Sequence, residues 1–153
     1  GGVLATFSRS DGRLAELLSA PQGGSAEPPT QAIIDARTNK IKMKGNETFK
    51  VAVRSLTEVS QEVLAGAGVT VDQIDLFVPH QANKRIIDAV GDRLGVPPEK
   101  GYVNLERVGN TSAASIPLAL REAADRGVLE RGDLVLASAF GGGLTWAAAV
   151  FRW

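Results

Sequence analysis

Apolar residues in the longest patterned segment recur every three or four positions, which is the spacing of a helix with one buried face. They are Phe49, Val53, Leu56, Val59 and Val63. Charged residues occupy the other faces, and Gly66-Ala67-Gly68 follows with the glycine that suits a helix C-cap. We therefore expect a long helix here, with Asn46 as its N-cap.

Two later segments have the same helical spacing. One runs from Gln81 to Leu94 and closes at Gly95. The other runs from Thr111 to Arg126, with Gly127 as its stop. Pro117 lies inside the second segment and is expected either to kink the helix or to mark its first turn.

Short apolar runs predict the strands, at Val3–Phe7, Asp75–Val78, Leu134–Ala139 and Thr145–Phe151. The last two flank three consecutive glycines, which favours an antiparallel pair. Two further stretches, Ala32–Asp35 and Ile41–Met43, flank a polar Thr-Asn-Lys sequence and are expected to form a hairpin.

The alternation of strands and helices predicts an α/β fold, a layered mixed β-sheet with helices on both faces. At 153 residues the chain is expected to be one domain, residues 1–153. Pro21–Thr30 holds three prolines and two glycines, so we expect a surface loop there.

Composition and charge argue against several kinds of partner and site. The formal net charge is zero, which gives no electrostatic reason to expect nucleic acid or a membrane surface as partner. No apolar run is long enough to span a bilayer. The absence of cysteine excludes a disulfide, a thiolate metal site and a cysteine nucleophile within these residues. A single histidine without clustered carboxylates argues against a metal site. We expect a cytoplasmic protein.

Three segments offer hydrogen-bond donors suited to a developing oxyanion. His80 follows a predicted strand, where active sites of open α/β folds usually lie. Asn110 follows Gly109 at a predicted junction before a helix, and Gly141–Gly143 permits close approach of backbone N–H groups. The plainer alternatives are a structural histidine, an N-cap asparagine and a hairpin turn.

Four motifs stand out in the sequence: KMKGNETFK at Lys42–Lys50, VPHQANKRI at Val78–Ile86, GNTSAASIP at Gly109–Pro117 and AFGGGLTW at Ala139–Trp146. In this order and spacing they resemble the motifs of β-ketoacyl-acyl-carrier-protein synthase III, a family with the thiolase-like fold. The resemblance runs from Gly2 to Trp153 and covers the C-terminal half of the family's chain. The family condenses an acyl group, received from acyl-CoA on a cysteine, with malonyl-acyl-carrier protein, and it holds no permanent cofactor.

The resemblance implies roles for individual residues. His80 and Asn110 would bind the malonyl thioester oxygen, and the backbone N–H of Gly142 would serve the oxyanion of the tetrahedral intermediate. Phe140 would pack beside the cysteine and limit water.

The resemblance further implies partners and the residues that meet them. The walls of the phosphopantetheine channel would be Gly45, Phe49, Ala82 and Asn83. Arg85 would dock the acyl carrier protein. A homodimer and a cysteine-bearing N-terminal half of the same enzyme are also implied.

The missing nucleophile leaves three interpretations open. The abrupt Gly-Gly start favours a C-terminal domain whose N-terminal half lies upstream, which predicts an exposed apolar face for that half. The chain could instead belong to an acyltransferase with an oxygen or nitrogen acceptor, in which His80 is the general base. It could also be a non-catalytic half that supports a partner.

Overall fold

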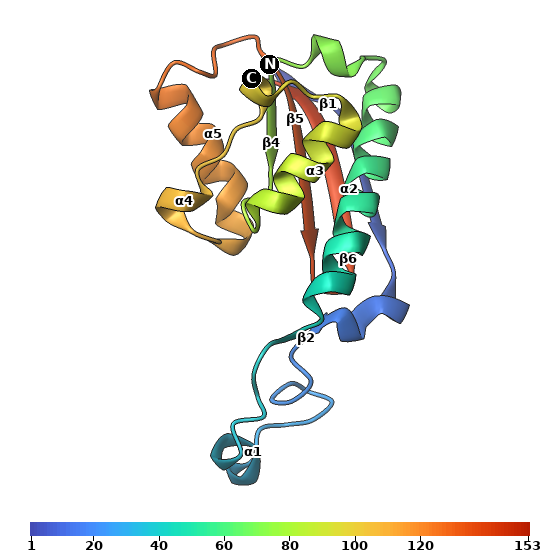
Figure 1. Cartoon of the computed structure of the whole chain (residues 1–153), viewed down its shortest axis with the longest axis vertical. Helices are drawn as coiled ribbons and strands as arrows, with labels where there is room; N and C mark the ends of the chain where they lie inside the picture. Colours follow the sequence, from blue (N-terminus) through green and yellow to red (C-terminus); the bar gives the residue numbers. More distant parts are fainter.

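The computed structural model describes residues 1–153 and has a four-stranded mixed sheet at its centre (Figure 1). The strands are β1 (Gly2–Ser10), β4 (Leu76–Pro79), β5 (Leu134–Gly141) and β6 (Thr145–Arg152). Their order is β1-β6-β5-β4, with β4 and β5 parallel and the other two pairs antiparallel. The expected mixed sheet, including the antiparallel pair around the triple glycine, is confirmed.

Helices lie on both faces of this sheet, as expected. The helices α2 (Gly45–Ala67) and α3 (Lys84–Leu94) cover one face and share its main apolar core with β4, β5 and β6. On the other face, α5 (Ser115–Asp125) packs over β4 and β5. Burial on both sides explains why every residue of β4 is apolar and buried.

The second face is covered only in part. Beyond α5, small and apolar side chains line a shallow open concavity that includes Ala137, Ala139, Ala147 and Ala149. Thr6 and Ser8 of β1 continue the same surface, whereas the ring of Phe7 lies on the opposite face, against Gly66 of α2. The exposed apolar face expected from the sequence is therefore present.

Residues between β1 and α2 project from this body (Figure 1). After a 3₁₀ turn at Gly12–Leu17, the chain passes through β2 (Leu18–Ser19), α1 (Gln31–Asp35) and β3 (Lys42–Met43). Pro21–Thr30 is an irregular, mostly exposed loop, as predicted. The predicted hairpin is wrong: β3 pairs with β2, and residues 31–35 are helical because the Thr30 hydroxyl caps the backbone N–H of Ile33.

Several predicted helix boundaries are also wrong by a few residues. The N-cap of α2 is Lys44, not Asn46. Residues 81–83 form a turn, and α3 begins after Asn83, whose side chain accepts from the N–H of Arg85. A 3₁₀ turn at Ser112–Ala114 precedes α5, so that Pro117 lies in the first turn of the helix, where its missing N–H costs nothing.

The remaining short elements connect β4 to α5. They are the 3₁₀ turn at Pro98–Lys100 and the helix α4 (Leu105–Val108), while a further 3₁₀ turn at Val71–Gln73 lies between α2 and β4. Tyr102 and Val103 lie outside any strand, although the neighbouring Gly101 forms an isolated bridge with β4.

Candidate active site

The carboxyl ends of β4 and β5 and the N-termini of α2, α3 and α5 all lie toward the same edge of the sheet (Figure 1). Parallel strands with helical connections produce this arrangement. Helix N-termini carry partial positive charge from unpaired backbone N–H groups. The edge is therefore suited to a group that becomes negatively charged.

His80 stands at this edge, directly after β4. Its backbone N–H donates to the carbonyl oxygen of Ser138 on β5 at 2.8 Å. Its ring Nδ1 lies 2.5 Å from the Oγ atom of Ser115, the first residue of α5. Burial lowers the pKa of the imidazole below its ordinary value of 6.5, so that the ring is neutral at pH 7.

Asn110 lies between α4 and the 3₁₀ turn at Ser112–Ala114, which leads into the start of α5. Its Oδ1 atom accepts a hydrogen bond from the backbone N–H of Ser112 at 3.0 Å. Since a backbone N–H can only donate, the bonded atom is the oxygen, and the Nδ2 group of Asn110 is left to donate elsewhere. The side chain closes a local turn and is not the N-cap of α5.

One short segment, Ser112–Ser115, thus forms a hydrogen bond with one polar atom of each candidate donor side chain. Ser112 binds the oxygen of Asn110, and Ser115 binds one ring nitrogen of His80. The second ring nitrogen of His80 and the amide nitrogen of Asn110 remain available for a ligand.

Gly142 lies in the exposed turn between β5 and β6. Two backbone hydrogen bonds between Leu144 and Asp11, of 2.9 and 3.1 Å, tie this turn to the chain after β1. Gly143 has a φ of +147°, and a Cβ atom there would lie 2.7 Å from the Oγ1 atom of Thr145. The geometry of the turn therefore itself requires glycine at position 143.

Phe140 precedes this turn on β5. Its ring stacks on that of Trp146 across the strand pair, with 6.3 Å between ring centroids, and both pack against the main core. Phe140 lies two residues after Ser138, the partner of the His80 backbone, which places it toward the same edge.

The expected channel residues gather where α2 and α3 begin. Gly45 and Phe49 lie one turn apart on α2, and Ala82 and Asn83 form the exposed turn before α3. The guanidinium carbon of Arg85 lies 5.1 Å from the centroid of the Phe49 ring, a cation–π contact that joins the two helix starts.

Sequence reasoning assigned no role to two side chains that support the site. Ser115 is 1% exposed, and Gln81 is fully buried. Gln81 donates to the carbonyl oxygens of Pro79 and Tyr102 and accepts from the backbone N–H of Asn104. Both residues lie within motifs quoted above, but the sequence does not reveal that they are buried.

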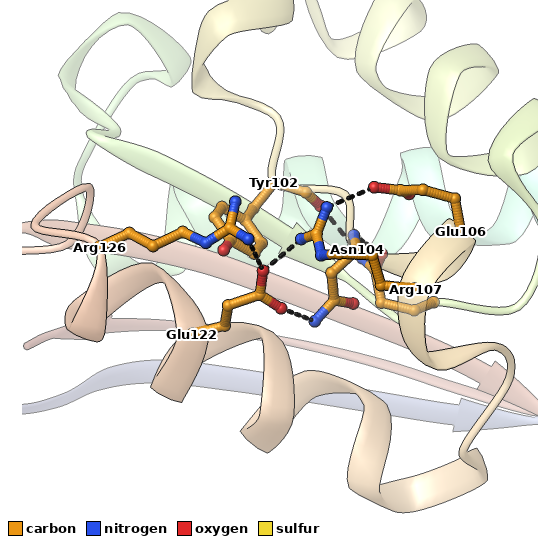
Figure 2. Close-up of polar contacts among 7 residues, drawn as sticks. Tyr102, Asn104, Glu106, Arg107, Glu122 and Arg126 are labelled. Carbon is orange, nitrogen blue, oxygen red and sulfur yellow. Dashed lines mark hydrogen bonds and ion pairs between the residues drawn. The ribbon is translucent and has the colours of Figure 1, made fainter.

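Asn104 continues this network toward α5. Figure 2 shows Glu122 between the side chains of Asn104, Arg107 and Arg126. The Nδ2 group of Asn104 donates to Glu122 at 2.8 Å, and Arg126 forms an ion pair with it at 2.9 Å. The hydrogen bond from Asn104, together with the two arginines, holds the pKa of the Glu122 carboxyl below its ordinary value. The loop that leads to Asn110 is thereby fixed to α5.

Other kinds of site are not evident in the structure. No three histidine, aspartate or glutamate side chains are grouped so that they could hold a metal ion. None of the helices combines the length and the apolar character needed to cross a bilayer.

Comparison with known proteins shows the family of the chain. Residues 64–153 match the family model "3-Oxoacyl-[acyl-carrier-protein (ACP)] synthase III C terminal". The β-ketoacyl-[acyl-carrier-protein] synthase III of Rhodopirellula baltica is 51% identical over 152 residues, which are 99% of this chain and 44% of the relative.

Solved structures give the same result. The crystal structure of 3-oxoacyl-[acyl-carrier-protein] synthase III from Aquifex aeolicus VF5 has a TM-score of 0.87 and 48% identity, over 99% of this chain and 44% of that one. The priming β-ketosynthase of the R1128 polyketide pathway has a TM-score of 0.84 and 35% identity, over 99% of this chain and 45% of that one. The chain thus spans less than half the length of these relatives, and it belongs to the 3-oxoacyl-[acyl-carrier-protein] synthase III family, with the thiolase-like fold of that family's C-terminal part.

Proposed function

We propose that this chain is the C-terminal catalytic part of an enzyme that condenses an acyl group, received from acyl-CoA, with malonyl-acyl-carrier protein. The observation that carries the proposal is the shared orientation of His80 and Asn110 by the segment Ser112–Ser115. Each side chain has one polar atom occupied and one nitrogen free, as two donors to a single oxygen require.

The chemistry needs such a pair. Loss of carbon dioxide from the malonyl thioester leaves the electron pair of the broken C–C bond on an enolate, with negative charge on its oxygen. Two neutral N–H donors, from His80 and Asn110, stabilise that oxygen without protonating the carbon. The carbon then attacks the acyl-cysteine thioester, and the cysteine leaves as thiolate.

The remaining site residues serve the second half of this reaction. Attack on the thioester produces a tetrahedral oxyanion, for which the exposed backbone N–H of Gly142 is a donor. Phe140, held by its stacking on Trp146, would exclude water from the thioester. Gly45, Phe49, Ala82 and Asn83 would line the phosphopantetheine channel, and Arg85 would contact the carrier protein.

The acyl-accepting cysteine must come from outside these 153 residues. We propose that it lies in an N-terminal half of the same enzyme, seated on the open face formed by β1, β5 and β6. A cytoplasmic homodimer that interacts with acyl carrier protein completes the proposal, with the product used in fatty-acid or polyketide synthesis. No permanently bound cofactor is required.

The general-base alternative fits the site less well. A base that accepts a proton becomes cationic and is usually supported by a carboxylate. The partner of the His80 ring is a hydroxyl group, and burial of the ring disfavours the cation. A non-catalytic supporting half would need none of the free donors described above.

Two half-reactions test the proposal in the protein that carries this chain. His80→Ala and Asn110→Ala should each lower carbon dioxide release from malonyl-acyl-carrier protein by roughly 10²–10³-fold while cysteine acylation by acyl-CoA continues. The exposed substitution Gln61→Ala on α2 is the control. Equal loss of both half-reactions would contradict the assigned roles. CoA release with an alcohol or amine acceptor, without a malonyl donor, would establish the acyltransferase instead.

A further inference from the structure

The Oγ atom of Ser115 has two neighbours and only one hydrogen. It lies 2.5 Å from His80 Nδ1 and 3.3 Å from the backbone nitrogen of Gln81. The Gln81 N–H can only donate, so it uses one lone pair of the hydroxyl oxygen. The hydroxyl hydrogen then remains to be placed.

Two arrangements of that hydrogen are conceivable. In the first, Ser115 donates to Nδ1, and the neutral ring carries its own hydrogen on Nε2. In the second, Nδ1 carries the hydrogen and donates to Ser115, whose hydroxyl hydrogen then needs another acceptor. Ser115 is 1% exposed and has no third partner. A buried donor without an acceptor is unfavourable, so the first arrangement is preferred.

We infer that Ser115 is a positioning residue that fixes His80 as the Nε2–H tautomer. This inference deepens the proposed function and rests on it, since the tautomer matters only if His80 donates to a substrate oxygen. With the hydrogen on Nε2, the ring presents a donor to the site. With the hydrogen on Nδ1, it would present a lone pair to a negatively charged oxygen.

The surroundings of the His80 ring favour its neutral form, which is the form that has tautomers. A cationic imidazole carries hydrogens on both nitrogens and has no tautomers. Here the ring is half-buried and lies at the N-terminus of α5, whose positive end disfavours a second proton. No acidic side chain contacts the ring. The same tautomer also separates the two catalytic hypotheses, because a general base acting through Nε2 would need that nitrogen unprotonated.

Histidine-selective ¹⁵N NMR at pH 7.5 on the protein that carries this chain tests the inference directly. The His80 signals are those missing from a His80→Gln variant. We expect Nε2 to be protonated and Nδ1 to be unprotonated. In Ser115→Ala the signals should move toward those of a mixture of tautomers. In Ser115→Thr, which keeps the hydroxyl, they should match the wild-type signals. In Ser115→Asp the carboxylate can only accept, so Nδ1 should become protonated.

The functional readout is malonyl decarboxylation. Ser115→Ala should lower its kcat about tenfold with little change in KM, less than complete removal of an oxyanion donor, because the ring remains in place. Ser115→Thr should restore the rate. Ser60→Ala, which removes an equally buried hydroxyl without a partner on α2, is the matched control.

The outcomes separate this inference from the proposed function. A wild-type ring protonated on Nδ1, or Ser115→Ala spectra identical to those of Ser60→Ala, would overturn the role of Ser115 even in an active condensing enzyme. The expected spectra in a protein that releases no carbon dioxide would instead leave the tautomer assignment standing and refute the proposed function.

Discussion

The side chain of Gln81 accepts a hydrogen bond from the backbone N–H of Asn104 at 2.9 Å, and this bond joins the strand end that carries His80 to the loop that leads to Asn110. The same amide donates to the carbonyl oxygens of Pro79 and Tyr102, at 2.8 and 3.1 Å. All three bonds lie in the protein interior. The segments that carry the two proposed donors are therefore joined by a side chain that is itself inaccessible to substrate.

Replacing this amide by an apolar group should be costly. Gln81→Leu leaves a buried N–H and two buried carbonyl groups without their partner, so we expect the free energy of unfolding to fall by about 1–3 kcal/mol. Malonyl decarboxylation should fall more than cysteine acylation, because the positions of His80 and Asn110 become less defined. Denaturant titration and the two half-reactions measure these effects.

Gln61→Leu is the control for this experiment, since Gln61 is exposed on α2 and such changes usually stay within about 0.5 kcal/mol. Equal stability of the two variants would show that the Gln81 network does not hold the site together.

The lowered pKa of His80 predicts a specific dependence of stability on pH. Below about pH 6.5 the unfolded chain takes up a proton on this histidine, while the folded protein does so only at lower pH. The free energy of unfolding should therefore decrease as the pH falls from 6.5 toward the folded-state pKa, with a slope of at most about 1.4 kcal/mol per pH unit. Above pH 6.5 this contribution is complete.

His80→Gln should remove this component of the slope, and His80 is the only histidine in the chain, so the difference is attributable to one group. Urea titrations between pH 5.5 and 7.5 measure it. Parallel slopes for the two proteins would mean that the ring titrates normally in the folded state.

The turn after β5 offers a matched pair of glycine substitutions. Gly143→Ala places a methyl group at a φ of +147° and 2.7 Å from the Thr145 hydroxyl oxygen. We expect a loss of about 1–3 kcal/mol in stability and a slower condensation step, because the neighbouring N–H of Gly142 is displaced. At Gly141 an added Cβ meets nothing within 4 Å, so Gly141→Ala should stay within about 0.5 kcal/mol. Thermal melts that do not separate the two variants would argue against this account of the turn.

Most of the architecture could be predicted from periodicity. Buried residues of α2 recur at helical spacing, and β4 and most of β5 are continuous buried apolar runs, and such patterns are local. The hairpin predicted between β1 and α2 was wrong. Its short segments have no core to face, so side-chain capping by Thr30 decides their conformation instead of hydrophobic spacing.

The candidate site divides in the same way. His80, Asn110 and Gly142 stand next to strand ends or glycines, which are visible in the sequence. Ser115 and Gln81 are recognised only once burial and partners are known, because serine and glutamine are ordinarily solvated. The roles of supporting residues depend on three-dimensional neighbours that no local pattern encodes.

The contact between Arg85 and Phe49 leads to a prediction about carrier-protein docking. The guanidinium lies over the aromatic ring, and Arg85 forms no ion pair, so its charge remains available to an acidic partner. Arg85→Ala should raise the KM for malonyl-acyl-carrier protein about fivefold, the effect of one exposed ion pair of roughly 1 kcal/mol.

A substrate that lacks the protein surface provides the discriminating measurement. For malonyl-pantetheine the KM should be nearly the same in Arg85→Ala and wild type, since the lost contact is with the carrier protein. The fivefold difference should shrink as salt is raised, because exposed charges are screened. Arg121→Ala, on α5 and already paired with Asp125, is the control and should change neither KM. An equal rise for both substrates would place Arg85 in the channel wall and not on the docking surface.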